Sequence, residues 1–170
     1  MKKSKLQTEF DTQEASPGFL LWQISNKWQS EQRKALKAFG LTHVQFVLLA
    51  SLVWASDESS FTQKQLAEHA KTDTMMTSQV LRVLERKRLI TRTVGISDGR
   101  SFTLSPTEDG IILANKVIGV VETVDKRFFS ILNSNLQNFT AMMQVLASLS
   151  PAVSTALRQR TDSPNFSASK

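Results

Sequence analysis

The hydrophobic periodicity of this chain changes near its middle, and this change restricts the folds that the chain can adopt. In residues 90–104, apolar and polar side chains alternate in two short runs around the turn pair Asp98-Gly99, which predicts a β-hairpin of about 15 residues. On both sides of this segment the apolar residues recur every three or four positions, as in amphipathic helices. We therefore expect a mainly α fold that contains one small β-hairpin.

Capping motifs mark where the helices before the hairpin begin. Ser16-Pro17 combines an N-cap residue with a first-turn proline, and it predicts a helix over residues 16–39. The capping boxes Thr42–Gln45 and Thr62–Gln65 predict the starts of the next two helices. A fourth helix is expected over about residues 73–88, directly before the hairpin.

Two further helices are predicted after the hairpin. Ser105–Glu108 combines an N-cap serine, a first-turn proline and a capping-box glutamate, which predicts the start of a long helix. Ser134–Gln137 predicts the start of a last helix, which ends before Pro151. The tails, residues 1–15 and 151–170, lack periodicity and are expected to be flexible.

The basic residues gather in the segment that holds the short helices and the hairpin. The chain has a net charge of +6, and residues 61–105 carry 8 of the positive and 4 of the negative charges. A helix–turn–helix followed directly by a hairpin is the winged-helix arrangement, which we expect over about residues 41–105. A local basic excess indicates a polyanionic partner, and double-stranded DNA is the usual one. The alternative is an ordinary solvated surface.

The helix over residues 73–88 has the two faces that a DNA-reading helix requires. Thr77, Val80, Leu81 and Leu84 form an apolar face, whereas Met75, Gln79, Arg82 and Arg86 follow helical spacing on the opposite side. Gln79 can pair with adenine, Arg82 with guanine, and a methionine can contact a thymine methyl group. The alternatives are that a methionine packs internally and that the arginines contact only phosphates. The predicted DNA-binding residues are Thr74, Met75, Met76, Ser78, Gln79, Arg82, Arg86, Arg92 and Arg100.

Two of these residues belong to the hairpin, with Arg92 on its stem and Arg100 just after its tip. A hairpin beside a helix in the major groove lies along the adjacent minor groove, whose negative potential attracts arginine. Asp98 would add repulsion there, so we expect it to orient Arg100 through a charge-assisted hydrogen bond. The alternative is that Asp98-Gly99 is only a turn pair.

The order of these motifs over residues 41–116 resembles the MarR family of bacterial winged-helix regulators. The matching pieces are Leu41-Thr42, Leu66-Ala67-Glu68, Leu84-Glu85-Arg86-Lys87-Arg88-Leu89-Ile90, Asp98-Gly99-Arg100-Ser101 and Leu104-Ser105…Gly110. One departure is Arg88, because the family commonly has glycine at this position. The resemblance implies one domain over residues 16–150, in which helices 16–39 and 106–149 form a homodimer that binds a palindromic DNA operator.

The resemblance also implies that the protein is a repressor, which a small aromatic or lipophilic effector releases from DNA. Trp22, Trp28, Phe46 and Trp54 are the candidate pocket residues, and the alternative is that each is ordinary core. The apolar stripes of the terminal helices exceed what one winged helix can cover, which independently favours a dimer.

Several function classes are not expected for this chain. It has no cysteine, its two histidines lie outside metal-binding motifs, and it has no glycine-rich phosphate loop, so we expect no catalytic residue, metal or cofactor. No apolar run is long enough to span a bilayer, so we expect no membrane association and a cytoplasmic location. The alternative function is a winged-helix protein-interaction module without sequence-specific DNA binding.

Overall fold

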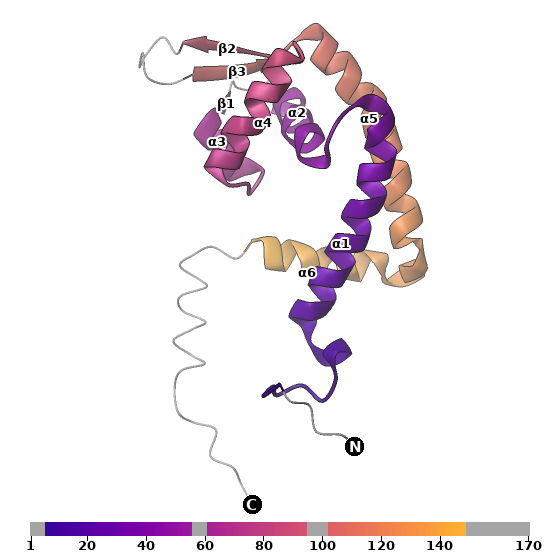
Figure 1. The fold of residues 1–170 in the computed structure, drawn as a ribbon. Helices are drawn as coiled ribbons and strands as arrows, with labels where there is room; N and C mark the ends of the chain where they lie inside the picture. The colour runs from indigo at the N-terminus through magenta and orange to yellow at the C-terminus, as the bar shows by residue number, and fades with distance from the viewer. Residues whose placement is uncertain (1–5, 56–60, 95–101, 149–170) are drawn as a thin grey trace, which may run out of the picture. The chain divides into compact units, whose positions relative to one another are not determined.

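The computed structural model describes residues 6–55, 61–94 and 102–148, and it forms a mainly helical protein with one small sheet (Figure 1). The chain divides into two compact units, one that ends at Phe128 and one that begins at Phe129. The elements, in chain order, are η1 (Gln13–Ala15), α1 (Pro17–Leu36), η2 (Lys37–Phe39), α2 (His43–Ala55), β1 (Phe61–Thr62), α3 (Gln63–His69), α4 (Thr74–Arg86), β2 (Ile90–Val94), β3 (Phe102–Pro106), α5 (Glu108–Phe129), η3 (Ser130–Asn135) and α6 (Leu136–Ala147).

The predicted capping motifs of the first three helices are confirmed. Ser16 Oγ accepts a hydrogen bond from Phe19 N at 3.4 Å, where α1 begins. At the start of α2, Gln45 N donates to Thr42 Oγ1 at 3.3 Å and Thr42 N donates to Gln45 Oε1 at 3.2 Å. The box at the start of α3 forms the same reciprocal pair of bonds. These local bonds satisfy backbone N–H groups that have no partner inside the helix.

Two predicted helix ends are placed differently by the structure. The helix over residues 16–39 is α-helical only to Leu36, after which its last turn tightens to the 3₁₀ segment η2 before Gly40, with φ of 63°. Helix α4 ends at Arg86 rather than Arg88, because Arg88 adopts a left-handed conformation with φ of 60°. A left-handed residue ends a helix, and glycine adopts this conformation most easily.

The predicted starts of the last two helices also need correction. Ser105 lies inside strand β3, opposite Thr91, and the cap of α5 is Thr107, whose Oγ1 accepts a hydrogen bond from Gly110 N at 3.0 Å. Segment η3 separates α5 from α6; it is kinked at Asn133, whose φ of 47° is not helical, and Asn135 makes no side-chain capping bond. Residues 6–15, predicted as part of a flexible tail, contain the short helix η1.

The sheet has three antiparallel strands in the order β1-β3-β2. The hairpin strands β2 and β3 pair from Ile90 opposite Pro106 to Val94 opposite Phe102. Strand β1 has only two residues, too few for an alternating pattern, and the sequence did not predict it. The hairpin tip, residues 95–101, lies outside the described residues.

The core of the first unit joins both sides of the winged-helix segment to α1 and α5. Its fully buried apolar side chains are mainly leucines and come from five helices and two strands, namely Leu36, Leu48, Leu49, Leu66, Leu81, Leu84, Ile90, Leu104 and Val117. Gly110, in the first turn of α5, lies so close to Leu89 that a Cβ atom would overlap the Leu89 backbone oxygen. A side chain is therefore excluded where α5 passes the end of α4.

Apolar side chains remain exposed on helices at both ends of the chain. In the second unit, Phe129 and Phe139 contact each other at 6.0 Å between ring centroids, while the other described residues of α6 are exposed. The large exposed apolar residues of α1 and α6 are Leu20, Leu21, Trp22, Ile24, Leu136, Met142, Met143, Val145 and Leu146. Within the described residues, no single helix has the length and hydropathy of a membrane span; α1–η2 and α2 pass such a test only as a pair bent by 75°.

Candidate nucleic-acid interface

Helix α4 has one buried face and one open face. Asp73 caps its first turn by accepting a hydrogen bond from Met76 N at 2.9 Å. Thr77, Leu81 and Leu84 are fully buried, as the predicted apolar face requires. Their burial fixes which residues of this helix point outward.

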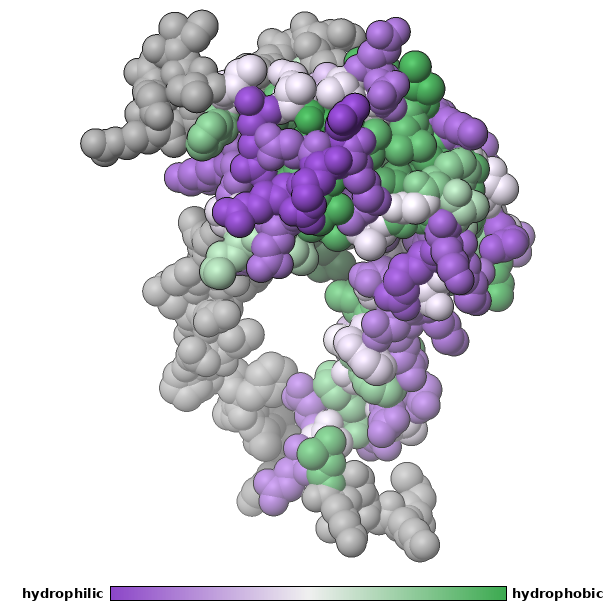
Figure 2. Space-filling view, turned by 45° about the horizontal axis from the view of Figure 1, so that its top comes forward, coloured by the Kyte–Doolittle hydropathy of each residue, from purple (hydrophilic) through white to green (hydrophobic). Residues whose placement is uncertain are grey.

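The open face of α4 carries most of the predicted DNA-binding residues. Met75 and Met76 are 75% and 41% exposed, so neither methionine packs inside the core. Ser78 is half-buried, and the remaining candidates on this helix, Thr74, Gln79, Arg82 and Arg86, are exposed. In Figure 2 the surface over α3 and α4 is mostly hydrophilic. This face thus combines hydrogen-bonding and positively charged side chains with two exposed methionines, which are the groups that recognise base edges.

The hairpin residues predicted to contact DNA are placed less simply. Arg100 and Asp98 lie outside the described residues, so their predicted roles stay predictions. Arg92 points inward, with only 15% of its side chain exposed, and its Nε atom lies 3.2 Å from Glu85 Oε2 on α4. The structure therefore places Arg92 between the sheet and α4, away from the open face of the helix.

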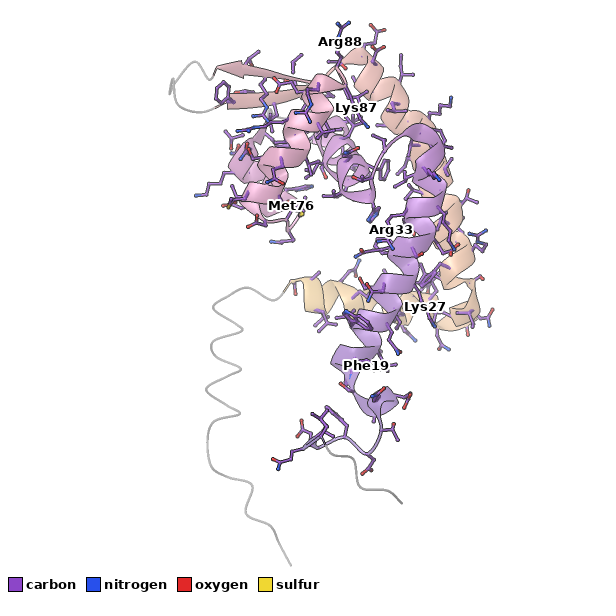
Figure 3. The ribbon with its side chains drawn as sticks, viewed as in Figure 1. Phe19, Lys27, Arg33, Met76, Lys87 and Arg88 are labelled. Atoms are coloured by element: carbon purple, nitrogen blue, oxygen red, sulfur yellow. The ribbon has the colours of Figure 1, made fainter. Side chains whose placement is uncertain are left out.

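Hydrogen bonds on two sides hold the C-terminal end of α4, and the sequence analysis did not predict them. Lys87 Nζ donates hydrogen bonds to the backbone oxygen of Gly40 and to Gln45 Oε1. On the other side, Thr107 Oγ1 donates to Arg88 O at 2.7 Å and Thr107 N donates to Leu89 O at 3.0 Å. Met76 lies near the opposite end of α4 from Lys87 and Arg88 (Figure 3). We call the bonds of Thr107 to Arg88 and Leu89 the joint at the end of α4. Its only signal in the sequence was Arg88, at a position where glycine is common.

The four candidate effector-pocket residues have different surroundings. Phe46 belongs to the buried core, whereas Trp22 and Trp54 are 62% and 88% exposed. Trp22 stacks on Phe19 at 6.0 Å, and a cavity of about 630 Å³ that Phe19 lines contains none of the four candidates. In this structure the four side chains do not share one environment, and their role in a pocket remains a prediction.

A partly buried polar cluster joins α1 to α5 beside the start of α2. Asp125 Oδ1 accepts hydrogen bonds from Trp28 Nε1 and from Gln32 Nε2, both at 2.7 Å. The His43 ring meets Trp28 edge-on at 4.8 Å. Burial lowers the pKa of His43 below its usual value, and the negative charge of Asp125 opposes this effect.

The lowered pKa of His43 makes the stability of the protein depend on pH. The free energy of unfolding should fall as the pH drops below the ordinary histidine pKa of about 6.5. In that range the unfolded chain binds more protons at His43 than the folded protein does, so acid favours unfolding. Urea unfolding at two pH values, 7.5 and 5.5, measures this, and His43→Gln should make the fall smaller. His69→Gln, at the exposed second histidine, is the matched control and should leave the fall unchanged. Equal falls for His43→Gln and the unmodified chain would contradict the assignment to His43.

Known sequences agree with this fold and surface. Residues 41–102 match the model of the MarR family. The chain is 41% identical over 140 residues to YdcH of Bacillus subtilis, named an uncharacterized HTH-type transcriptional regulator, with 82% of this chain and 95% of YdcH covered. It is 32% identical over 136 residues to the HTH-type transcriptional repressor Rv2887 of Mycobacterium tuberculosis, covering 79% and 96%.

Solved structures give the same result. The Staphylococcus aureus MepR–DNA complex matches with a TM-score of 0.69 and 27% identity, covering 79% of this chain and 98% of MepR. Rv2887 in complex with p-aminosalicylic acid matches with a TM-score of 0.63 and 30% identity, covering 79% and 100%. The resemblance seen in the sequence is confirmed by the family model and by relatives matched over nearly their whole length: the chain belongs to the MarR family.

Proposed function

We propose that this protein is a homodimeric transcriptional regulator that binds a palindromic double-stranded DNA operator. The observation that carries the proposal is the open face of α4, where Gln79, Arg82 and Arg86 are exposed while Leu81 and Leu84 are buried. A helix of this kind fits the major groove and reaches base edges with its outer side chains. The MepR–DNA complex supports this use of the fold.

The exposed side chains divide into two roles. Gln79 suits adenine and Arg82 suits guanine, since each presents two hydrogen-bonding groups to one base. Met75 and Met76 offer apolar contacts to thymine methyl groups. Arg86, the last residue of α4, supplies positive charge for phosphates, and Arg100 is predicted to do so for the minor groove.

A second copy is expected to cover the exposed apolar side chains of α1 and those of α6. A monomer rarely exposes this many large apolar residues on two helices, and a twofold dimer buries such a surface against itself. Sedimentation at micromolar concentration should give a dimer, and a monomer alone would contradict the proposal.

Selection from a random DNA pool with the purified protein tests the function directly. Two recognition helices in successive major grooves require half-sites about 10 base pairs apart, within an imperfect palindrome of roughly 16–20 base pairs. Selected sites without inverted symmetry would contradict the twofold arrangement. Enrichment of no DNA would favour the alternative, a protein-interaction module.

Arg82→Ala should weaken binding to the selected operator by about 1–3 kcal/mol, mainly at one base position in each half-site. The reason is that Arg82 is exposed on the open face of α4, within reach of base edges. Titrations against operators changed at single positions measure this. Lys126→Ala removes an exposed positive charge from α5 and should leave base preference unchanged. Equal weakening on all sequences would assign Arg82 to phosphate contact instead.

We further propose repression that a small aromatic or lipophilic effector relieves. Support comes from Rv2887, which is named a repressor and has been solved with p-aminosalicylic acid and with salicylic acid. Salicylate added to the protein–operator complex should release the DNA; no release by salicylate or larger aromatic acids would contradict this. We also infer that the protein has no enzymatic role, needs no cofactor and works in the cytoplasm.

A further inference from the structure

The direction of Arg92 follows from the pleat of strand β2. Alternate residues of a strand share a face, so Arg92 lies on the same side as Ile90, which is 2% exposed. Its cross-strand partner is Leu104, which is also 2% exposed. Arg92 is therefore a charged residue on the inner, apolar face of the hairpin.

The guanidinium of Arg92 has one charged partner there. Its Nε atom forms an ion pair with Glu85 Oε2 at 3.2 Å, while Nε and Nη2 are both shielded from solvent and neither makes a hydrogen bond among the described residues. A buried cation without its counter-ion is costly, so the Glu85 carboxylate holds this side chain in place. The contact joins the middle of β2 to the last turn of α4.

The place of Glu85 on α4 gives this ion pair a second consequence. Glu85 is three residues after Arg82 and directly before Arg86, so its carboxylate is within one helical turn of both. In the described structure it pairs with Arg92 instead, and the side chain remains 44% exposed. Among the described residues, Glu85 therefore forms its ion pair with Arg92 and not with Arg82, its neighbour on the same helix.

Arg92 also lines an open pocket of about 400 Å³ together with residues of β1, α3, α4 and β3: Thr62, Gln63, Lys64, Thr74, Phe102 and Leu104. The ion pair of Arg92 with Glu85 lies beside this pocket and joins two elements that are both expected at the DNA.

We propose that Arg92 is a positioning residue rather than a DNA contact: it ties the hairpin to α4 through Glu85 and holds that carboxylate away from Arg82. The proposal rests on the DNA-binding function proposed above. The proposal predicts an effect of removing Glu85 that is opposite to the effect expected from its negative charge alone. An acidic residue near DNA repels phosphates, yet here its removal weakens binding.

The test measures affinity for the selected operator at several salt concentrations for Glu85→Ala, Arg92→Gln and the double variant. Because coupled residues act as a unit, each single variant should bind about fivefold to tenfold more weakly, and the double variant no worse than either. The slope of log K against log salt should be unchanged for all three, since no phosphate contact is lost. Glu68→Ala, which removes an exposed carboxylate from α3, is the control and should tighten binding slightly.

Two results would overturn the proposal: tighter binding by Glu85→Ala, as for the control, or a salt slope reduced by about one unit in Arg92→Gln. If circular dichroism shows that Arg92→Gln does not fold, the half-exposed Glu85 still decides through Glu85→Ala alone. Failure of the unmodified protein to bind any DNA would instead contradict the proposed function, so the two failures are distinct.

Discussion

Replacing Gly110 by alanine should lower the free energy of unfolding by about 3 kcal/mol, because the added methyl group has no space. A Cβ at this position would overlap the backbone oxygen of Leu89 and would lie 3.3 Å from Leu49 Cδ1. The backbone of Leu89 is held by its hydrogen bond from Thr107, so it cannot move aside without breaking the joint at the end of α4. Denaturant unfolding measures the loss.

Gly119→Ala is the matched control for that experiment, since Gly119 lies in the same helix and a Cβ there would meet nothing within 4 Å. Alanine is favoured over glycine inside a helix by about 1 kcal/mol, so this change should stabilise the protein. Similar unfolding energies for Gly110→Ala and the unmodified chain would contradict the close approach of α5 to Leu89.

Asp125→Ala should cost about 2–5 kcal/mol of the free energy of unfolding, because a half-buried donor and a buried donor lose their acceptor at once. Trp28 Nε1 and Gln32 Nε2 both donate to Asp125 Oδ1, and Gln32 is fully buried. Unfolding by urea gives the loss, and tryptophan fluorescence follows the environment of Trp28 when Trp22 and Trp54 are replaced by phenylalanine in all variants.

Two control variants separate this effect from a general loss of charge. Asp125→Asn keeps an acceptor oxygen and should recover part of the stability. Glu122→Ala removes an exposed carboxylate from the same helix and should change stability little. An equal effect of Asp125→Ala and Glu122→Ala would contradict the role of the polar cluster.

The helix starts could be predicted because their determinants are local. The cap at Ser16 and the boxes beginning at Thr42 and Thr62 each join residues three positions apart, so sequence spacing alone specifies the bond. The predicted start of α5 was wrong because local spacing alone does not decide it. Ser105 and Thr107 offer competing caps, and the pairing of Ser105 with Thr91 in the sheet, which is not local, decides between them.

The faces of α4 were also predictable, since helical period separates Leu81 and Leu84 from Arg82. What the sequence could not give is the partner of a charged side chain. Arg92 is two residues after Ile90 and therefore shares its inward face, but the carboxylate that Arg92 contacts is on another element. The bonds of Asp125 to Trp28 and Gln32 join residues more than 90 positions apart, so no spacing rule predicts them.

The joint at Thr107 makes α5 a lever arm for the recognition helix. The helix has 22 residues and is about 33 Å long at 1.5 Å per residue. Since its first turn is fastened to Arg88 and Leu89, a rotation of about 6° about its far end moves the end of α4 by about 3.4 Å, the rise of one base pair along one strand. In a dimer whose copies meet at the far end of α5, a small change of angle would therefore displace α4 by the size of one base-pair step, with no rearrangement inside either winged helix.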